Sequence, residues 1–484
     1  MNSIFMAENL DRQIVKGVSW NLIEIFSVYL SRFLIGVVLA RILFPADVGL
    51  IAIITIFISI SDVFVNAGFG QAFIYKKDAS KEDADTIFVI NLVIGLIIYA
   101  VLFFIAPYIA SFFNQEILTS LIRVFSVIVI INAFNVIQNS IIRKEFQFKK
   151  RAIVTIIATF FGGGLGIFCA YSGLGVWSLV IQQLSNRLLL NILLYFSCKW
   201  RISIRFSMTI AKELFSYGSW ILLANLFLTI FNNLYKFIIG KLYSDVQLGL
   251  YERAKQFESM IADTFTMVLG NVAFPVFSKL QNSTQSLEVK TNNFIFYSCM
   301  IIYPMLTCLI IVAKPFIVFL ITDKWLLAVP YLRLLCMVGY LIPLNFFIGP
   351  LLQATGHPRK ALYYTFILGL MRIANVALTF KYGVSGIIIG EFIILIIATI
   401  GMSIYIRPFI GFNYLSFLKE FTGLVLVTGL AALMGYLLLS HIYSLSDFLQ
   451  TILPCLCIAT IYTIWMIAFE RAKIKQICKA LISR

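Results

Sequence analysis

Apolar runs of about twenty residues follow one another along most of this chain, with only short polar breaks between them. An α-helix of that length crosses the hydrocarbon core of a bilayer. Hydrophobic residues make up 61% of the 484 residues and the mean hydropathy is +0.96, far above the mixture of soluble domains. The runs lack the alternation of a membrane β-barrel, and an open sheet cannot satisfy its backbone in lipid. The sequence therefore predicts an all-α polytopic membrane protein.

We expect about fourteen transmembrane helices by the length criterion. The predicted spans are 18–43, 48–75, 86–113, 117–142, 152–171, 176–197, 215–243, 257–280, 294–321, 326–354, 361–381, 384–406, 419–440 and 450–469.

The basic residues indicate an orientation rather than a nucleic-acid partner. The net charge is +16, but lysines and arginines gather in every second short loop, for example at 143–151, while 172–175 carries none. By the positive-inside rule we expect a multi-pass membrane protein with both termini in the cytoplasm. The basic stretch 241–255 is an exception, because it falls on the outer side. No small-residue cleavage site follows the first apolar run, so we expect no cleaved signal peptide.

Part of the chain recurs at an offset of about two hundred residues. The pattern Ser-Trp-x-Leu at 19–22 returns at 219–222, and the polar break at 39–50 returns at 239–250. Farther along the chain the offset grows to 210, as small loop insertions would produce. The matched single residues are Gly49 with Gly249, Arg123 with Arg333, and Asn135 with Asn345.

The repeat predicts two parallel six-helix lobes, because spans one to six and seven to twelve have the same orientation. The predicted parts are an N-terminal lobe at 1–197, a linker at 198–214, a C-terminal lobe at 215–409, and two additional helices with a basic tail at 410–484. The linker alternates basic and apolar residues. An interfacial segment on the anionic inner leaflet and a plain solvated loop fit it equally well.

Polar residues form one-sided stripes on the first two helices of each predicted lobe. An arginine, lysine or aspartate in mid-span costs roughly 3 kcal/mol, so such residues normally face water or one another. Arg32 and Lys236 are mid-span cations of spans one and seven, and we expect them to contact an anionic substrate. The predicted substrate-binding residues are Arg32, Lys236, Asn225, Asn232 and Glu24.

Five further charged residues are candidates for a cleft or for ion coupling. A buried structural ion pair is an equally good interpretation of each of them. Single asparagine, serine or threonine residues more often bond neighbouring helices. The five candidates are Asp62, Asp263, Arg187, Arg372 and Glu391.

The sequence does not predict an enzyme, a metal site or a cofactor. It has no Walker A motif, and its eight cysteines and two histidines lack metal-ligand spacing. No polar segment is long enough for an extramembrane catalytic domain. The glycine-rich run at 162–166 is interpreted as helix packing, since no strand precedes it.

Four segments together resemble the bacterial polysaccharide exporters of the Wzx and teichuronic or colanic acid type. The segments are LARILFPADVGLIA at 39–52, GVWSLV at 175–180, IGKLYSDVQLGLYERAKQ at 239–256 and FPVFSKLQ at 274–281. These exporters belong to the multidrug/oligosaccharidyl-lipid/polysaccharide flippase superfamily. The resemblance implies two six-helix lobes in a V around a central cationic cleft.

The same resemblance implies a location in the bacterial cytoplasmic (inner) membrane and a function. This function is the translocation, by alternating access, of undecaprenyl-pyrophosphate-linked oligosaccharide units to the outer leaflet for surface polysaccharide synthesis (O-antigen, capsule or exopolysaccharide). The implied partners are this lipid-linked oligosaccharide and membrane lipids, with the polysaccharide polymerase machinery as a further candidate. An ion-coupled multidrug exporter of the same fold is the first alternative, in which acidic groups should dominate. A membrane-embedded glycosyl polymerase is the second, although we expect from it a large outer loop that this chain lacks.

Overall fold

A computed structural model describes residue 20 and the ranges 24–66, 68–76, 78–145, 147–198, 200–281, 283–410 and 414–469. All the regular secondary structure of the described part is helical, and this part contains no strand. The chain divides into two compact units, Met1–Gly249 and Leu250–Arg484. Both chain ends, on which the prediction of cytoplasmic termini depends, lie outside the described residues.

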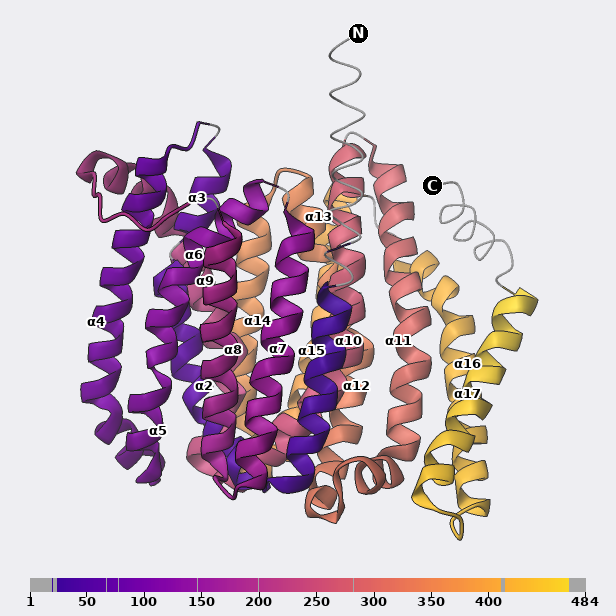
Figure 1. Ribbon diagram of the computed structural model, residues 1–484. Coiled ribbons are helices and arrows are strands. Elements are labelled where there is room, and N and C mark those ends of the chain that lie inside the picture. The colour runs from indigo at the N-terminus through magenta and orange to yellow at the C-terminus, as the bar shows by residue number, and fades with distance from the viewer. Residues whose placement is uncertain are drawn as a thin grey trace. The chain divides into compact units, whose positions relative to one another are not determined.

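The first unit is a set of long helices that run alongside one another (Figure 1). α2 packs on α9, α4 on α6, and α7 on α8. Its described helices are the first span Glu24–Ile42, α2 Pro45–Asn66, α3 Phe69–Tyr75, α4 Lys81–Phe113, α5 Ile117–Phe125, α6 Val127–Lys144, α7 Phe148–Tyr171, α8 Val176–Ser197 and α9 Met208–Leu242.

The second unit begins at Leu250, within α10 (Asp245–Lys279). α11 packs on α12 and α17, α14 on α15, and α16 on α17. The remaining described elements are α11 Thr284–Ile321, the 3-10 helix η1 Asp323–Ala328, α12 Val329–Phe346, α13 Ile348–Ala354, α14 Pro358–Thr379, the 3-10 helix η2 Phe380–Tyr382, α15 Gly383–Ile410, α16 Tyr414–His441 and α17 Asp447–Phe469.

The predicted all-α membrane fold is confirmed. Thirteen described segments are long and apolar enough to cross a membrane, and one of them, Pro358–Arg407, contains both α14 and α15. The predicted fourteen spans agree with this division. The predicted lobe boundaries at 197 and 215 stay a prediction. In the structure α9 belongs to the first compact unit, because it packs against α2, α3 and α4.

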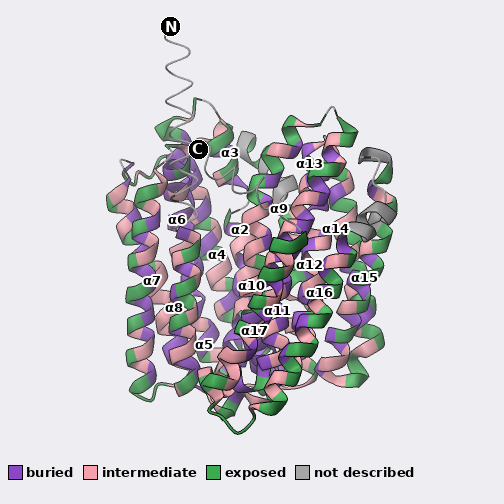
Figure 2. Ribbon diagram, turned by 90° about the vertical axis from the view of Figure 1, so that its right-hand side faces the viewer, coloured by how far each residue is buried: buried purple, intermediate pink, exposed green. Residues whose placement is uncertain are grey.

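Small residues let α7 and α8 approach closely. A Cβ at Gly162 would lie 2.8 Å from the carbonyl oxygen of Gln182, and one at Gly166 would lie 2.7 Å from the Gln182 Cβ. The interpretation of the run at 162–166 as helix packing is therefore confirmed. Figure 2 shows exposed residues along α7. Ile153 and Phe160 of this helix are exposed, as expected of side chains in contact with lipid.

Equivalent residues of the repeat make equivalent contacts. Arg123 Nε donates a hydrogen bond to the Phe103 carbonyl oxygen on α4 at 3.3 Å. Arg333 Nε donates to the Ile310 carbonyl oxygen on α11 at 3.2 Å. Both arginines thus tie their own helix to the long helix that precedes it, which supports the duplication inferred from the sequence.

Two equivalent glycines meet where α2 and α10 begin. A Cβ at Gly49 would lie 1.8 Å from the Asp245 carbonyl oxygen, and one at Gly249 would lie 1.8 Å from the Pro45 carbonyl oxygen. Pro45 and Asp245 are themselves separated by the two-hundred-residue offset. The contact is therefore reciprocal, backbone against backbone, and any side chain at either glycine would force the two helix starts apart.

The basic stretch 241–255 departs from the loop-charge pattern because part of it lies within a helix. Arg253 and Lys255 belong to the membrane-crossing segment Asp245–Lys279. Arg253 is only 5% exposed, and Lys255 Nζ lies 2.6 Å from Glu258 Oε2. The positive-inside rule counts loop cations, so it does not apply to these two residues.

The basic loops that follow spans two and four lie together. Lys144 Nζ donates to the Phe73 carbonyl oxygen at 3.1 Å, which ties the end of α6 to α3. Nearby, Ser80 caps α4 through a reciprocal bond with Asp83, and Lys76 Nζ lies 2.8 Å from Asp83 Oδ1. The lysines of both loops therefore lie at the same end of the first unit.

We expect this basic end to face the cytoplasm. Cysteines introduced at Ser80 and Lys150 should react with a membrane-impermeant maleimide only when it is added from the cytoplasmic side. A cysteine at Ser172, in the short turn between α7 and α8, should react only from outside. Labelling of position 172 from the cytoplasm would contradict the orientation.

Candidate functional site in the first unit

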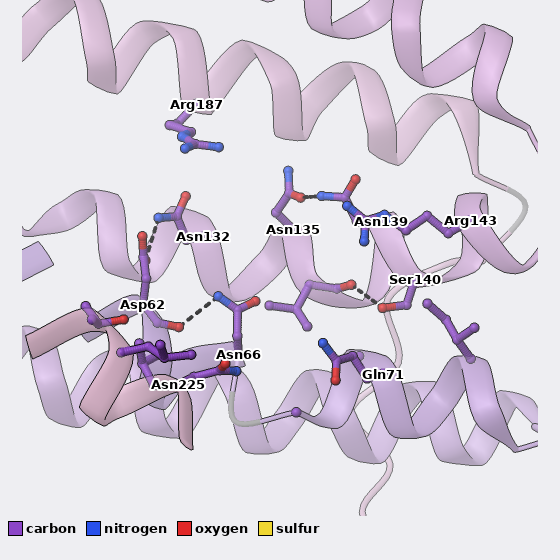
Figure 3. A pocket seen from close by; sticks show the side chains of 17 residues that line it. Asp62, Asn66, Gln71, Asn132, Asn135, Asn139, Ser140, Arg143, Arg187 and Asn225 are labelled. Atoms are coloured by element: carbon purple, nitrogen blue, oxygen red, sulfur yellow. Dashed lines mark hydrogen bonds between the residues drawn. The ribbon is translucent and has the colours of Figure 1, made fainter. Parts of the chain in front are cut away.

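A polar pocket of about 490 Å³ lies within the first unit, among helices that are otherwise apolar. It is lined by α2, α3, α6, α8 and α9. Figure 3 shows polar side chains of these helices gathered around one space. The polar lining side chains are Asp62, Asn66, Gln71, Asn132, Asn135, Asn139, Ser140, Arg143, Arg187, Asn225 and Thr229.

α6 contributes the longest row of polar side chains. Asn132, Asn135, Asn139 and Arg143 follow one another at steps of three and four residues, so they share one face of the helix. Asn139 Nδ2 donates to Asn135 Oδ1 within the row (Figure 3). The row ends in a cation at the basic end of the unit.

The opposite wall is built where α2 breaks into α3. Gly68 takes the left-handed conformation, with φ 75°, between the two helices. Gly70 then approaches α6 closely, because a Cβ there would lie 2.7 Å from Ser140 Oγ. The sequence prediction treated 48–75 as one uninterrupted span and missed this break. Interrupted helices are a common feature of substrate sites in transporters.

Two amides bond Asp62, one at its carboxylate and one at its backbone carbonyl. Asn132 Nδ2 donates to Asp62 Oδ1 at 2.8 Å, and Asn66 Nδ2 donates to the Asp62 carbonyl oxygen at 2.8 Å (Figure 3). The first bond links α2 to α6 across the pocket. The carboxylate is thus partly satisfied and oriented before any ligand is present.

Arg187 reaches the pocket from α8. It interacts electrostatically with Asp62, and also with Arg32 on the first span. Within the part of the chain that the structure describes, no group accepts a hydrogen bond from the Arg187 guanidinium. The lining therefore has two arginines, Arg187 and Arg143, against one carboxylate. Such a pocket favours an anionic ligand over a cationic one.

Three predicted residues converge in this pocket, namely Asp62, Arg187 and Asn225. Arg32 is exposed on the first span and is near enough to Arg187 for electrostatic repulsion. Asn232 and Lys236 lie farther along α9 than Asn225, by roughly 10 and 16 Å, and are not among the lining residues. Roles for Arg32, Asn232 and Lys236 stay predictions.

Glu24 lies in a buried contact with α7. Its Oε1 is 3.5 Å from Arg151 Nε and accepts a hydrogen bond from Thr155 Oγ1 at 3.3 Å. Only 6% of Glu24 is exposed. These contacts tie the first span to α7, and the predicted contact of Glu24 with substrate stays a prediction.

The other three predicted charges lie in the second unit, in ion pairs. Arg372 donates to Glu391 Oε1 from Nε at 3.1 Å and from Nη2 at 2.9 Å, which joins α14 to α15. Asp263 is the more exposed partner of Lys255, with Oδ2 at 4.0 Å from Nζ. Arg372 and Glu391, two separate candidates in the sequence, are therefore partners in the structure.

Sequence reasoning missed the α6 row, which lines more of the pocket than any other helix. The signal was available, since three asparagines and an arginine recur at helical spacing within the predicted span 117–142 and just beyond it. The α6 row belongs to the fourth predicted span, outside the polar stripes on the first two helices of each predicted lobe.

The polysaccharide biosynthesis protein family matches residues 38–330, more than half of the chain. The chain belongs to this family. The teichuronic acid biosynthesis protein TuaB of Bacillus subtilis (strain 168) is 23% identical over 358 residues, 74% of each protein. The lipopolysaccharide biosynthesis protein WzxC of Escherichia coli (strain K12) is 22% identical over 410 residues, 84% of this chain and 83% of that one. The resemblance drawn from the four segments is therefore confirmed.

The fold of this family member is that of a solved flippase. The lipid II flippase MurJ, in an inward closed conformation, superposes with a TM-score of 0.76 at 17% sequence identity, covering 94% of this chain and all of that one. At this identity the likeness establishes the fold alone. The chain is thus a polytopic membrane protein with a transporter fold.

Proposed function

We propose that this protein translocates a lipid-linked oligosaccharide across the cytoplasmic membrane, by alternating access, for surface polysaccharide synthesis. Membership of the polysaccharide biosynthesis family and the names of the relatives support a role in polysaccharide export. The observation that carries the proposal is the polar pocket of the first unit, with Arg143 and Arg187 among amide side chains.

The pocket chemistry matches the two polar parts of such a substrate. Arginine binds phosphate oxygens through paired N–H groups, and amides exchange hydrogen bonds with sugar hydroxyls. A pyrophosphate loses its hydration on entering hydrocarbon, and a polar pocket containing two cations offsets part of that cost. The lipid tail, which is apolar, has no need to leave the bilayer.

The same lining argues against the two alternatives. A drug exporter for cationic compounds is expected to surround its ligand with carboxylates, whereas this pocket has one, Asp62, already bonded by Asn132. A glycosyl polymerase is expected to present an outer catalytic loop. In the described part of the chain, the connections between successive spans are too short for one.

A cell that lacks this protein tests the proposal. We expect it to accumulate lipid-linked oligosaccharide on the inner leaflet, protected in intact cells from a glycan-cleaving enzyme added outside, and to lose surface polysaccharide. Re-expression of the wild-type chain should reverse both effects. Accumulation of the lipid-linked unit on the outer leaflet would contradict the proposal and would favour a polymerase.

Arg32 and Lys236 give a second test, because each is a cation on the first helix of a predicted lobe. Substituting both by glutamine should leave the amount of membrane protein unchanged, since removing an intramembrane charge eases insertion. Export should fall sharply, and Arg32→Lys should restore only part of it, because lysine lacks the paired donors. The readout is surface polysaccharide per unit of protein. Wild-type export by the well-expressed double variant would remove these two residues from the substrate path.

A further inference from the structure

A second cavity, of about 390 Å³, lies on the first unit between α6 and α8. It uses a different side of α6 from the row of asparagines, and its walls are mainly aliphatic and aromatic, for example Phe134, Leu188 and Ile192. Asn191 Nδ2 donates to the Ile131 carbonyl oxygen at 2.9 Å, which fixes the spacing of the two walls. We call this cavity the α6–α8 groove.

A buried polar side chain is among the residues that line this apolar groove. Gln138 lines it and is only 2% exposed, yet among the residues that the structure describes nothing donates a hydrogen bond to its Oε1. A buried acceptor without a donor is unfavourable, and an acyl chain supplies none. Gln138 lies toward the end of α8, since its carbonyl oxygen is 3.7 Å from Cys198 Sγ. The missing donor is therefore needed at that end of the groove.

The segment that follows α8 is pinned to α4 at two points. Trp200 Nε1 donates to Asp85 Oδ1 at 2.8 Å, in a buried contact. The Ser207 backbone N–H donates to Thr86 Oγ1 at 3.3 Å. Between these points the backbone forms neither helix nor strand, and Ile202 is one of the residues that line the groove.

Exposed basic and apolar side chains alternate along this pinned segment. Arg201 and Arg205 are exposed, while Ile204 is 86% and Phe206 51% exposed. Arg201 Nη1 donates to the Cys198 carbonyl oxygen at 2.5 Å, which holds the guanidinium at the C-terminal end of α8. Alternating arginines and large apolar side chains beside a membrane span suit the anionic surface of a leaflet.

We propose that the α6–α8 groove binds one phospholipid whose headgroup carries both a phosphate anion and a hydroxyl. Its acyl chain fills the apolar groove, and its phosphate lies between Arg201 and Arg205. A headgroup hydroxyl donates to Gln138 Oε1. Ile204 and Phe206 enter the same leaflet and hold the segment against the bilayer. The site is separate from the polar pocket and does not depend on what that pocket transports.

Lipid binding to the purified full-length chain tests this site. The probes are dioleoyl phosphatidylglycerol, phosphatidic acid and phosphatidylcholine, counted as bound copies by native mass spectrometry. We expect phosphatidylglycerol to bind about tenfold to thirtyfold more tightly than phosphatidylcholine, from two arginines at the membrane surface. Gln138→Leu should lower the affinity for phosphatidylglycerol to that for phosphatidic acid, and should leave phosphatidic acid binding unchanged.

The arginines are tested with a matched control. The variant Arg201→Gln, Arg205→Gln should bind phosphatidylglycerol no better than phosphatidylcholine. Arg359→Gln, Lys360→Gln, which removes a basic pair at the start of α14, should bind as the wild type does. If the double variant does not fold, two single variants take its place. Arg205→Gln removes one of the two cations, and Ile192→Trp fills the groove. Each of them should weaken phosphatidylglycerol binding.

Two results would overturn the proposal. One is equal affinity of the wild-type chain for phosphatidylglycerol and phosphatidylcholine. The other is displacement of phosphatidylglycerol by an isoprenoid pyrophosphate in competition, because this would assign the groove to the tail of the transported lipid instead.

Discussion

A covalent bridge between positions 46 and 246 is expected to reduce export to the background level. The two positions are equivalent in the repeat, and each directly follows one of the carbonyls that meet Gly249 and Gly49. If the substrate leaves on the outer side, the starts of α2 and α10 have to separate. A short bis-maleimide between Ala46→Cys and Val246→Cys, in a background without native cysteines, would prevent that separation.

The bridge has a matched control within the first unit. A Cβ at Gly175 would lie 3.6 Å from Asp47 Oδ1, so the turn between α7 and α8 is next to the start of α2. A bridge between Asp47→Cys and Leu174→Cys should therefore form and leave export intact. A cleavable reagent should restore export of the first pair after reduction. Full export with the 46–246 bridge in place would argue against separation of these helix starts.

The second large effect is expected at Arg187. Arg187→Gln should lower export by about tenfold to hundredfold, the size expected for losing one or two charge-assisted hydrogen bonds. Protein levels should not fall, because the guanidinium has no hydrogen-bond acceptor within the described part of the chain. Arg187→Lys should retain part of the activity. Lys290→Gln, which removes an exposed cation at the start of α11, is the control and should have no effect.

Asp62→Asn makes the same experiment discriminate between substrates. Asparagine has nearly the shape of aspartate and keeps an acceptor for Asn132, so the link between α2 and α6 should survive. An anionic substrate does not need the carboxylate, and at least half of wild-type export is expected to remain. The reverse order, in which Asp62→Asn abolishes export and Arg187→Gln is mild, would favour cation coupling or a cationic substrate.

The membrane fold could be predicted from the sequence because the length and hydropathy of each span are enough to identify it. The span 176–197 coincides with α8, Val176–Ser197. The break after Asn66 was missed because apolar residues continue through it, and a left-handed Gly68 does not lower hydropathy. The length and hydropathy of each span thus predict the number of spans, but they do not reveal a change of backbone conformation within a span.

The site was only half predictable for a related reason. Asp62, Arg187 and Asn225 could be named from the sequence, because each is a polar or charged residue within an otherwise apolar span. Which helices face one another depends on tertiary packing, which composition does not encode. For that reason Glu24, whose partner Arg151 lies at the start of α7, could be named as an intramembrane charge but not as one member of a pair.

The central claim is that this chain alone moves a lipid-linked oligosaccharide between leaflets. Its most direct test is a proteoliposome that contains the purified protein and an isoprenoid pyrophosphate oligosaccharide in both leaflets, with an impermeant glycan-cleaving enzyme outside. We predict that cleavage proceeds to completion with the wild-type protein and stops at the outer-leaflet fraction with Arg187→Gln or with empty vesicles. Cleavage that stops at the outer-leaflet fraction with the folded wild-type protein would contradict the claim.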